Sequence, residues 1–129
     1  MGVTYLWDTN IAVYYLQGQF PPEAEKLMDS LLEKGTPGIS AITEIELLCW
    51  KTQNERDLEV VREFIDDVFV FELERAVKQK TADLRKAHRI KLPDAIIAAT
   101  ALVHELKLVT RNTRDFDLIP GLAIINPWH

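Results

Sequence analysis

Short apolar segments alternate with longer segments of helical periodicity along this chain. In the longer segments, apolar residues recur every three or four positions, which is typical of amphipathic helices. The short segments are rich in β-branched, aromatic and aliphatic residues and indicate buried strands. The expected strands lie at residues 3–7, 38–39, 68–71, 108–110 and 122–125. Because hairpin signals are absent, the pattern predicts an α/β fold of three layers (α/β/α), with a central, mainly parallel sheet of about five strands.

Capping residues and helix breakers set the expected helix boundaries. Ser40 and Asn54 are good N-terminal caps, and Gly18 and Gly35 suit helix ends. The expected helices cover residues 11–16, 22–34, 41–51, 54–66, 74–89 and 93–102. The polar stretch 111–116 is expected to be a loop.

Composition adds limits on size and location. The chain has 129 residues, of which 47% are apolar and 27% charged, which is typical of a single globular domain spanning 1–129. No window approaches the roughly 18 apolar residues of a membrane span. The N-terminus lacks the basic segment and apolar run of a secretory signal. We therefore expect a cytoplasmic protein with no membrane partner.

The single cysteine and the net charge narrow the chemistry. Cys49 is the only cysteine, so no internal disulfide can form, and its apolar neighbours predict a small core residue. One cysteine and three scattered histidines do not favour structural zinc. A net charge of -5 is not that of a nonspecific nucleic-acid coat, which is normally basic. It remains compatible with a nucleic-acid enzyme whose acidic residues gather at a metal site.

Acidic residues recur at positions where α/β folds keep their functional sites. Asp8 follows the first strand, Asp94 lies in the first turn of a buried helix, and Asp115 lies in the loop after the fourth strand. Each has an ordinary interpretation alone: Asp8 as a helix cap, Asp94 as a charge that complements the helix dipole, and Asp115 as a loop residue. Their combined placement is what predicts a site.

The helix expected over 41–51 carries two glutamates that could join them. Glu46 is bordered by apolar residues, and burying such an acid costs free energy unless it has a partner. Glu44 lies on another side of the helix, where we expect solvent to be easier to reach. The helical periodicity therefore favours Glu46 over Glu44.

Carboxylates that converge need a cation. At about 5 Å, each like-charged pair costs on the order of 3 kcal/mol at an effective dielectric near 20. Raised pKa values or bound cations must offset this repulsion. Hard oxygen ligands without thiolate or imidazole select Mg²⁺ or Mn²⁺, ions that commonly act on phosphate oxygens.

Four stretches of this chain carry a family resemblance. They are L-W-D-T-N-I at 6–11, I-S-A-I-T-E-I-E-L at 39–47, L-P-D-A-I-I-A-A-T-A at 92–101 and V-T-R-N-T-R-D-F at 109–116. In these stretches, and in their order and spacing, the chain resembles the PIN-domain ribonucleases, and more narrowly the VapC toxins of toxin–antitoxin pairs. The resemblance spans nearly the whole chain.

The resemblance implies a metal-dependent endoribonuclease that hydrolyses RNA phosphodiester bonds. Its catalytic, metal-binding acids fall on Asp8, Glu46, Asp94 and Asp115, with Mg²⁺ as the metal and Mn²⁺ as a substitute. Related PIN domains often place the fourth acid where this chain has Asn112, so whether Asp115 or Asn112 fills the position stays open, as does the number of ions. The resemblance also implies RNA as substrate, a cognate antitoxin and a homodimer.

Other residues are candidate RNA contacts. Thr9, Asn10, Arg111 and Asn112 flank the acids and can meet phosphate or a metal-bound water. The basic cluster at 85–91 can also hold phosphate, although cations at a helix C-terminus equally favour its dipole. Aromatic residues such as Tyr14, Tyr15 and Trp50 are more often core or interface residues than base readers.

Two other functions fit part of the sequence. A PIN-like module that binds RNA or protein without cutting is the main alternative, and an intact acidic set argues against it. An aspartyl phosphatase with Asp8 as nucleophile would need a second aspartate two residues later, where this chain has Asn10.

Overall fold

The computed structural model describes residues 3–128. The strands are β1 (Tyr5–Trp7), β2 (Gly38–Ser40), β3 (Phe69–Phe71), β4 (Lys107–Val109) and β5 (Ile124–Ile125). The helices are α1 (Thr9–Gln17), α2 (Pro22–Glu33), α3 (Ala41–Leu48), α4 (Glu55–Asp67), α5 (Arg75–Ala87), α6 (Leu92–Val103) and α7 (Thr113–Phe116). In this part of the chain, none of the helices combines the length and hydropathy needed to cross a membrane.

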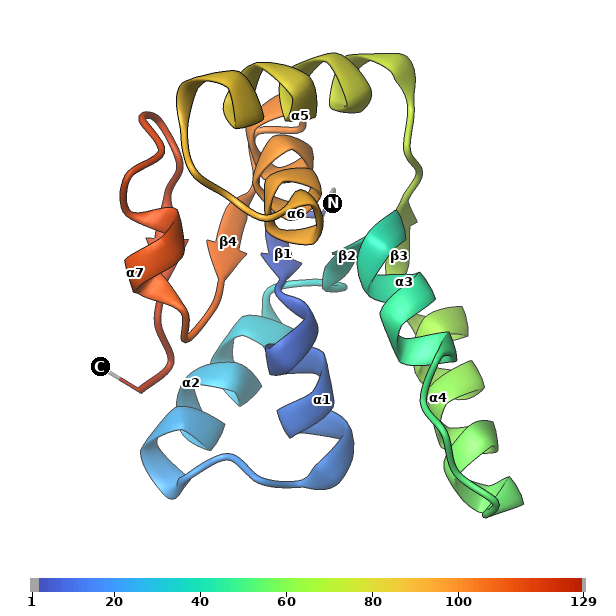
Figure 1. Ribbon diagram of the computed structural model, residues 1–129. Helices are drawn as coiled ribbons and strands as arrows, with labels where there is room; N and C mark the ends of the chain where they lie inside the picture. The colour runs from blue at the N-terminus through green and yellow to red at the C-terminus, as the bar shows by residue number, and fades with distance from the viewer. Residues whose placement is uncertain (1–2, 129) are drawn as a thin grey trace.

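The sheet is parallel throughout, with strand order β3-β2-β1-β4-β5 (Figure 1). This confirms the predicted α/β architecture and its mainly parallel sheet. The first strand lies at the centre, so the chain runs outward from β1 in both directions. Ligand sites of open parallel sheets lie beyond the carboxyl ends of strands at such a reversal of strand order. The fold therefore presents the residues after β1, β2 and β4 side by side.

Alternating side chains on the strands divide the core into two layers. Leu6 and Leu108 face the cluster beneath α5 and α6, whereas Trp7 and Val109 face the cluster formed with α1, α2 and α4. In Figure 1, α1 and α2 (blue) lie below the strands, and α5 (yellow) crosses above them. This alternation is the period of two that a strand buried on both faces requires.

Two local expectations were wrong. The stretch expected as a loop after β4 contains α7, a single helical turn that buries Phe116. The helix after β2 ends at Leu48, and Cys49 is exposed instead of lying in the core. The reason is that α3 turns Thr43 and Leu47 inward and leaves Ile45 outside.

A close approach at Gly38 gives a stability prediction. A Cβ atom at this buried position would lie 2.6 Å from Cε2 of Phe71 and 3.0 Å from Cγ1 of Val3. Because such overpacking typically costs about 1–3 kcal/mol, we expect Gly38→Ala to lower the free energy of unfolding by about that amount in chemical denaturation. In a Phe71→Leu background the same change should cost less, and strictly additive effects would contradict the proposed clash.

Candidate active site

Asp8 stands directly beyond β1 and is 95% buried, with a relative exposure of 5%. Its Oδ1 accepts a hydrogen bond from the Thr9 backbone N–H at 2.8 Å and so caps α1. Its Oδ2 accepts a hydrogen bond at 2.7 Å from the hydroxyl of Thr110, which directly follows β4. Asp8 therefore does cap a helix, but Thr110, directly after β4, also holds its other oxygen in place.

The Asp8 carboxyl lies in surroundings that disfavour its charge. Burial raises the pKa of Asp8 above its ordinary value of 3.8. The hydrogen bonds from Thr110 and Thr9 lower this pKa in part, and the charge of Glu46 raises it further. Two hydrogen bonds thus hold the Asp8 carboxyl at a fixed position while burial disfavours its charged form. A bound cation would stabilise that charged form.

Glu46 reaches the site through a chain of hydroxyl groups. The Thr9 hydroxyl donates to Glu46 Oε1 at 2.6 Å and lies 2.9 Å from the Thr43 hydroxyl. Ser40 Oγ donates to Thr43 Oγ1 at 3.2 Å. Since each hydroxyl has one hydrogen, Thr43 must donate to Thr9. The chain is therefore directed from Ser40 through Thr43 and Thr9 to the Glu46 carboxylate.

The exposures of the two α3 glutamates are opposite to the expectation. Glu46 is exposed and Glu44 is half-buried, because α3 packs against α1 and α6 and leaves the other face open. The preference for Glu46 rested on the wrong physical reason. Glu46 is nevertheless the glutamate that hydrogen-bonds Thr9, directly after Asp8.

Asp94 lies half-buried in the first turn of α6. Burial raises its pKa above 3.8, and the charges of Asp8, Asp115 and Glu46 raise it further in that order of influence. Lys91 lowers the pKa of Asp94 in part. The other three acids expected from the sequence thus act electrostatically on the Asp94 carboxyl group, although the four come from four separate segments of the chain.

The two candidates for the fourth position hydrogen-bond each other. Asn112 Nδ2 donates to Asp115 Oδ2 at 2.8 Å, and the Asn112 backbone N–H donates to the Thr110 hydroxyl at 3.0 Å. Asn112 therefore orients Asp115 and ties it to the same threonine that holds Asp8. Asp115 is the residue of this pair whose charge raises the pKa of Asp94.

The donor set fits a hard divalent cation but does not form a closed cage. Within residues 3–128, no three acidic, histidine or cysteine side chains lie close enough together to grip one ion. Mg²⁺ keeps several waters and is usually bound through one or two carboxylates. Mutually repelling carboxylates with only oxygen donors therefore suit such an ion, held partly through water.

Sequence reasoning missed the hydroxyl groups of the site. Thr110, Thr43 and Ser40 are buried and hydrogen-bonded around Asp8 and Thr9. Thr110 and Ser40 stand at the ends of predicted strands, as Asp8 does. Their placement is the sequence feature that could have identified them. Thr43 had no comparable signal, because its role depends on which face α3 turns toward α1.

The other residues proposed from the sequence as RNA contacts differ in their exposure and in their partners. Asn10 and Arg111 are exposed, and Arg111 Nη1 donates to the Tyr14 hydroxyl at 3.1 Å. In the basic cluster 85–91, Arg85 donates to the Ile90 carbonyl at 3.3 Å, while Lys91 acts on Asp94. Trp50 is exposed beyond the end of α3.

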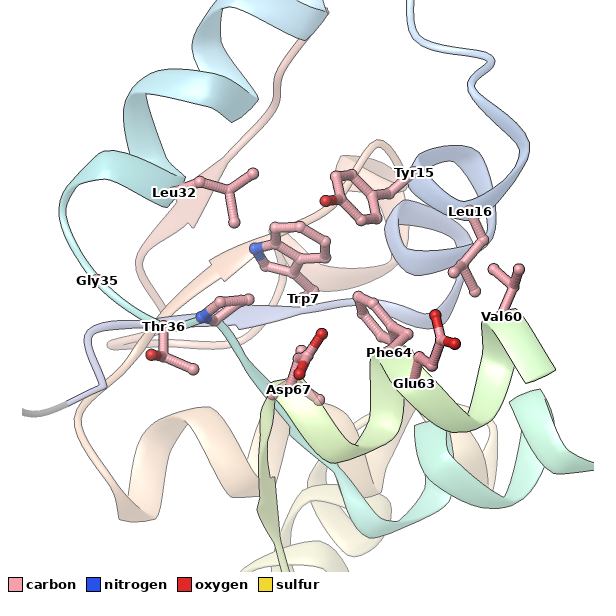
Figure 2. Close-up of a pocket in the computed structure, with 12 residues that line it drawn as sticks. Trp7, Tyr15, Leu16, Leu32, Gly35, Thr36, Val60, Glu63, Phe64 and Asp67 are labelled. Carbon is pink, nitrogen blue, oxygen red and sulfur yellow. The ribbon is translucent and has the colours of Figure 1, made fainter.

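A cavity lined by aromatic residues lies away from the acids. It has a volume of about 540 Å³, and its lining includes none of the four carboxylates. Trp7, Tyr15 and Phe64 form an aromatic wall, and Glu63 and Asp67 project from α4 at the edge (Figure 2). We call this space the aromatic groove. It is an apolar surface rather than a place for carboxylate chemistry.

Comparison with known families agrees with this geometry. The family model described as "PIN domain" matches residues 5–122. This match includes β1, the four acids and most of the chain after β4. The chain belongs to the PIN domain family.

Two curated relatives define the group within that family. The chain is 29% identical over 126 residues to the tRNA(fMet)-specific endonuclease VapC of Shigella flexneri, covering 92% of this chain and 93% of the relative. It is 32% identical over 123 residues to Ribonuclease VapC19 of Mycobacterium tuberculosis, covering 91% and 95%. These matches assign the chain to the VapC ribonucleases.

A solved structure shows the same fold along nearly the whole chain. The DNA-bound VapBC of Salmonella typhimurium superimposes with a TM-score of 0.82 at 29% identity, covering 98% of this chain and 99% of that chain. The recognised resemblance and the predicted fold class are thereby confirmed.

Proposed function

We propose that this protein is an endoribonuclease that hydrolyses RNA phosphodiester bonds as the toxin of a VapBC-type toxin–antitoxin pair. The observation that carries the proposal is the convergence of charge on Asp94, whose pKa is raised by Asp8, Asp115 and Glu46 as well as by burial. The names of the matched relatives, which are VapC nucleases, support the same activity. A module that only binds RNA has no use for such repulsion.

We further propose that a divalent cation, Mg²⁺ with Mn²⁺ as a substitute, completes the site. Asp8 and Asp94 would hold it, with Asp115 and Glu46 as further ligands or ligands to its waters. Such an ion supplies charge neutralisation on phosphate and lowers the pKa of bound water. The all-oxygen donor set supports this choice over zinc.

The residues around the acids would position the reaction. Thr110 and the Thr9 N–H hold Asp8, so its carboxylate keeps one orientation. Asn112 orients Asp115 in the same manner. The Glu46 carboxylate, fixed by Thr9, would orient the attacking water and accept its proton. Exposed Asn10 and Arg111 would contact the phosphate backbone of the RNA.

The hydroxyl chain gives a test of the role of Glu46. Thr9→Val removes the donor to Glu46 and leaves the buried Thr43 hydroxyl without its acceptor. We expect kcat for RNA cleavage to fall about tenfold, which corresponds to roughly 1.4 kcal/mol. Thr9→Ser keeps the hydroxyl and should stay close to wild type. Equal losses in both variants would indicate a packing role rather than orientation of Glu46.

The proposed partners are an RNA substrate, a cognate antitoxin and a second copy of the chain. Solved neighbours are VapBC complexes, which supports the antitoxin. The aromatic groove offers an apolar wall with Glu63 and Asp67 at its edge. We propose that an apolar segment of the antitoxin, flanked by basic residues, occupies this groove.

Charge reversal at the groove edge tests this contact. We expect Glu63→Lys with Asp67→Lys to weaken the complex with the co-expressed antitoxin about tenfold, mainly through slower association at low salt. RNA cleavage by the free toxin should be unchanged, because neither residue lies among the acids. Asp66→Lys, on the neighbouring exposed position of α4, is the matched control. Unchanged affinity in the double variant would exclude the groove as the antitoxin site.

A circular RNA tests the activity itself. Only an endonuclease can open a closed circle, so we expect linear product with Mg²⁺ or Mn²⁺ and none with EDTA. A folded, antitoxin-free protein that binds the circle but never opens it in either metal would favour the non-cleaving alternative.

A further inference from the structure

Arg111 is an exposed residue whose guanidinium contacts two neighbouring side chains. It follows Thr110, whose hydroxyl holds Asp8, so it lies at the edge of the acidic site. Its Nη1 donates to the Tyr14 hydroxyl at 3.1 Å, and its Cζ lies 4.6 Å from the centroid of the Trp128 ring. The hydrogen bond and the contact with the ring hold the guanidinium at the edge of the site.

The rings beneath Arg111 form a small cluster of their own, which we call the aromatic platform. Tyr14 lies on α1, Phe20 precedes α2, and Trp128 lies in the segment after β5. Ring centroids are 5.1 Å apart for Tyr14 and Trp128, 5.6 Å for Phe20 and Trp128, and 6.0 Å for Tyr14 and Phe20. The Trp128 backbone N–H donates to Asn126 Oδ1 at 2.9 Å. Three separate segments thus meet to build it.

The contacts leave the charge of Arg111 available. Both partners of the guanidinium are neutral, and no carboxylate within residues 3–128 forms an ion pair with it. Ordering a free arginine side chain costs rotamer entropy. A guanidinium that is ordered in advance by neutral groups loses less freedom when an anion binds its remaining in-plane donors.

We propose that Arg111, held by Tyr14 and Trp128, is a preformed subsite for a backbone phosphate of the RNA next to the scissile one. This inference rests on the proposed ribonuclease function. The acids repel RNA, so a cation fixed at their edge offsets that repulsion where the strand enters. The hydrogen bond to Tyr14 uses one donor of the guanidinium and leaves others for two-point binding of a phosphate. A lysine would supply the charge but not the planar set of donors.

The matched variants separate charge from geometry. Arg111→Lys keeps the charge but loses the planar fork, and Tyr14→Phe removes only the hydroxyl that orients it. For a short single-stranded RNA with Mg²⁺, we expect KM to rise about tenfold in Arg111→Lys and a few-fold in Tyr14→Phe, with kcat unchanged. Arg75→Lys, at the exposed start of α5, is the control and should match wild type.

Binding without cleavage supplies the second measurement. With EDTA present, fluorescence anisotropy of the labelled RNA should show the same order of affinities, with Arg111→Lys about tenfold weaker than wild type. If wild type cuts RNA while Arg111→Lys and Tyr14→Phe retain wild-type KM and affinity, the subsite is wrong and the ribonuclease function stands. If wild type neither cuts nor binds RNA, both the subsite and the proposed function are wrong.

Discussion

Replacing Asp94 with asparagine is expected to lower kcat/KM for RNA cleavage about a thousandfold or more, which corresponds to at least roughly 4 kcal/mol of transition-state stabilisation. Asp94 is the carboxyl on which the charges of the other three acids converge. The amide cannot supply the anionic ligand that the proposed cation needs. Initial rates on the same RNA, at matched protein concentrations, measure the loss.

The same change should not weaken the fold. Without a cation, the ionised Asp94 is held in surroundings that raise its pKa, so a neutral side chain of nearly the same shape removes repulsion. We expect the metal-free variant to melt at the wild-type temperature or above it. Asp66→Asn, on the exposed face of α4, should change neither activity nor melting. A variant that loses activity because it unfolds would leave no support for a catalytic role of Asp94.

Divalent cation is expected to stabilise the wild-type fold strongly and the Asp94→Asn variant weakly. Binding to the folded state alone adds about 2.7 kcal/mol when the ligand is at 100 times its Kd. Thermal unfolding with Mg²⁺ and with EDTA measures this difference. An equal shift in wild type and variant would mean that the cation binds away from Asp94.

The raised pKa values also give a sign to the pH dependence. The folded protein holds protons on Asp8 and Asp94 at pH values where the unfolded chain has released them. Its free energy of unfolding therefore falls as pH rises from the ordinary aspartate range through the raised pKa values. We expect the metal-free melting temperature of wild type, relative to Asp94→Asn, to decrease over that window. A rising difference would contradict the raised pKa of Asp94.

Much of the architecture could be predicted from local pattern. Strand alternation and helix caps such as Ser40 and Asn54 depend on neighbouring residues, and both caps form as expected. The one-turn helix α7 could not be found by periodicity, because four residues are too few to show a repeat. The exposure of Cys49 depends on how α3 packs, which no local pattern contains.

The site, too, could be predicted only in part from local pattern. Asp8 and Asp94 could be singled out because strand ends and helix starts are visible in the sequence. Thr110 also stands at a predicted strand end, but its hydrogen bond to Asp8, 102 residues away in the chain, could not be predicted from local pattern. The contact between Thr9 and Thr43, 34 residues apart, could not be predicted either. The aromatic platform beneath Arg111 was harder still to predict, because it forms only when Trp128, beyond the last strand, packs against α1. Such contacts depend on the three-dimensional meeting of segments.

The central claim is that the acids around Asp8 and Asp94 hold the catalytic cation. Anomalous diffraction from crystals soaked in Mn²⁺ tests this most directly. We expect a peak at coordination distance, about 2.0–2.6 Å, from carboxylate oxygens of Asp8 or Asp94, and its disappearance in Asp94→Asn crystals. An enzyme that cleaves RNA in Mn²⁺ but shows its only peak away from these carboxylates would contradict the account.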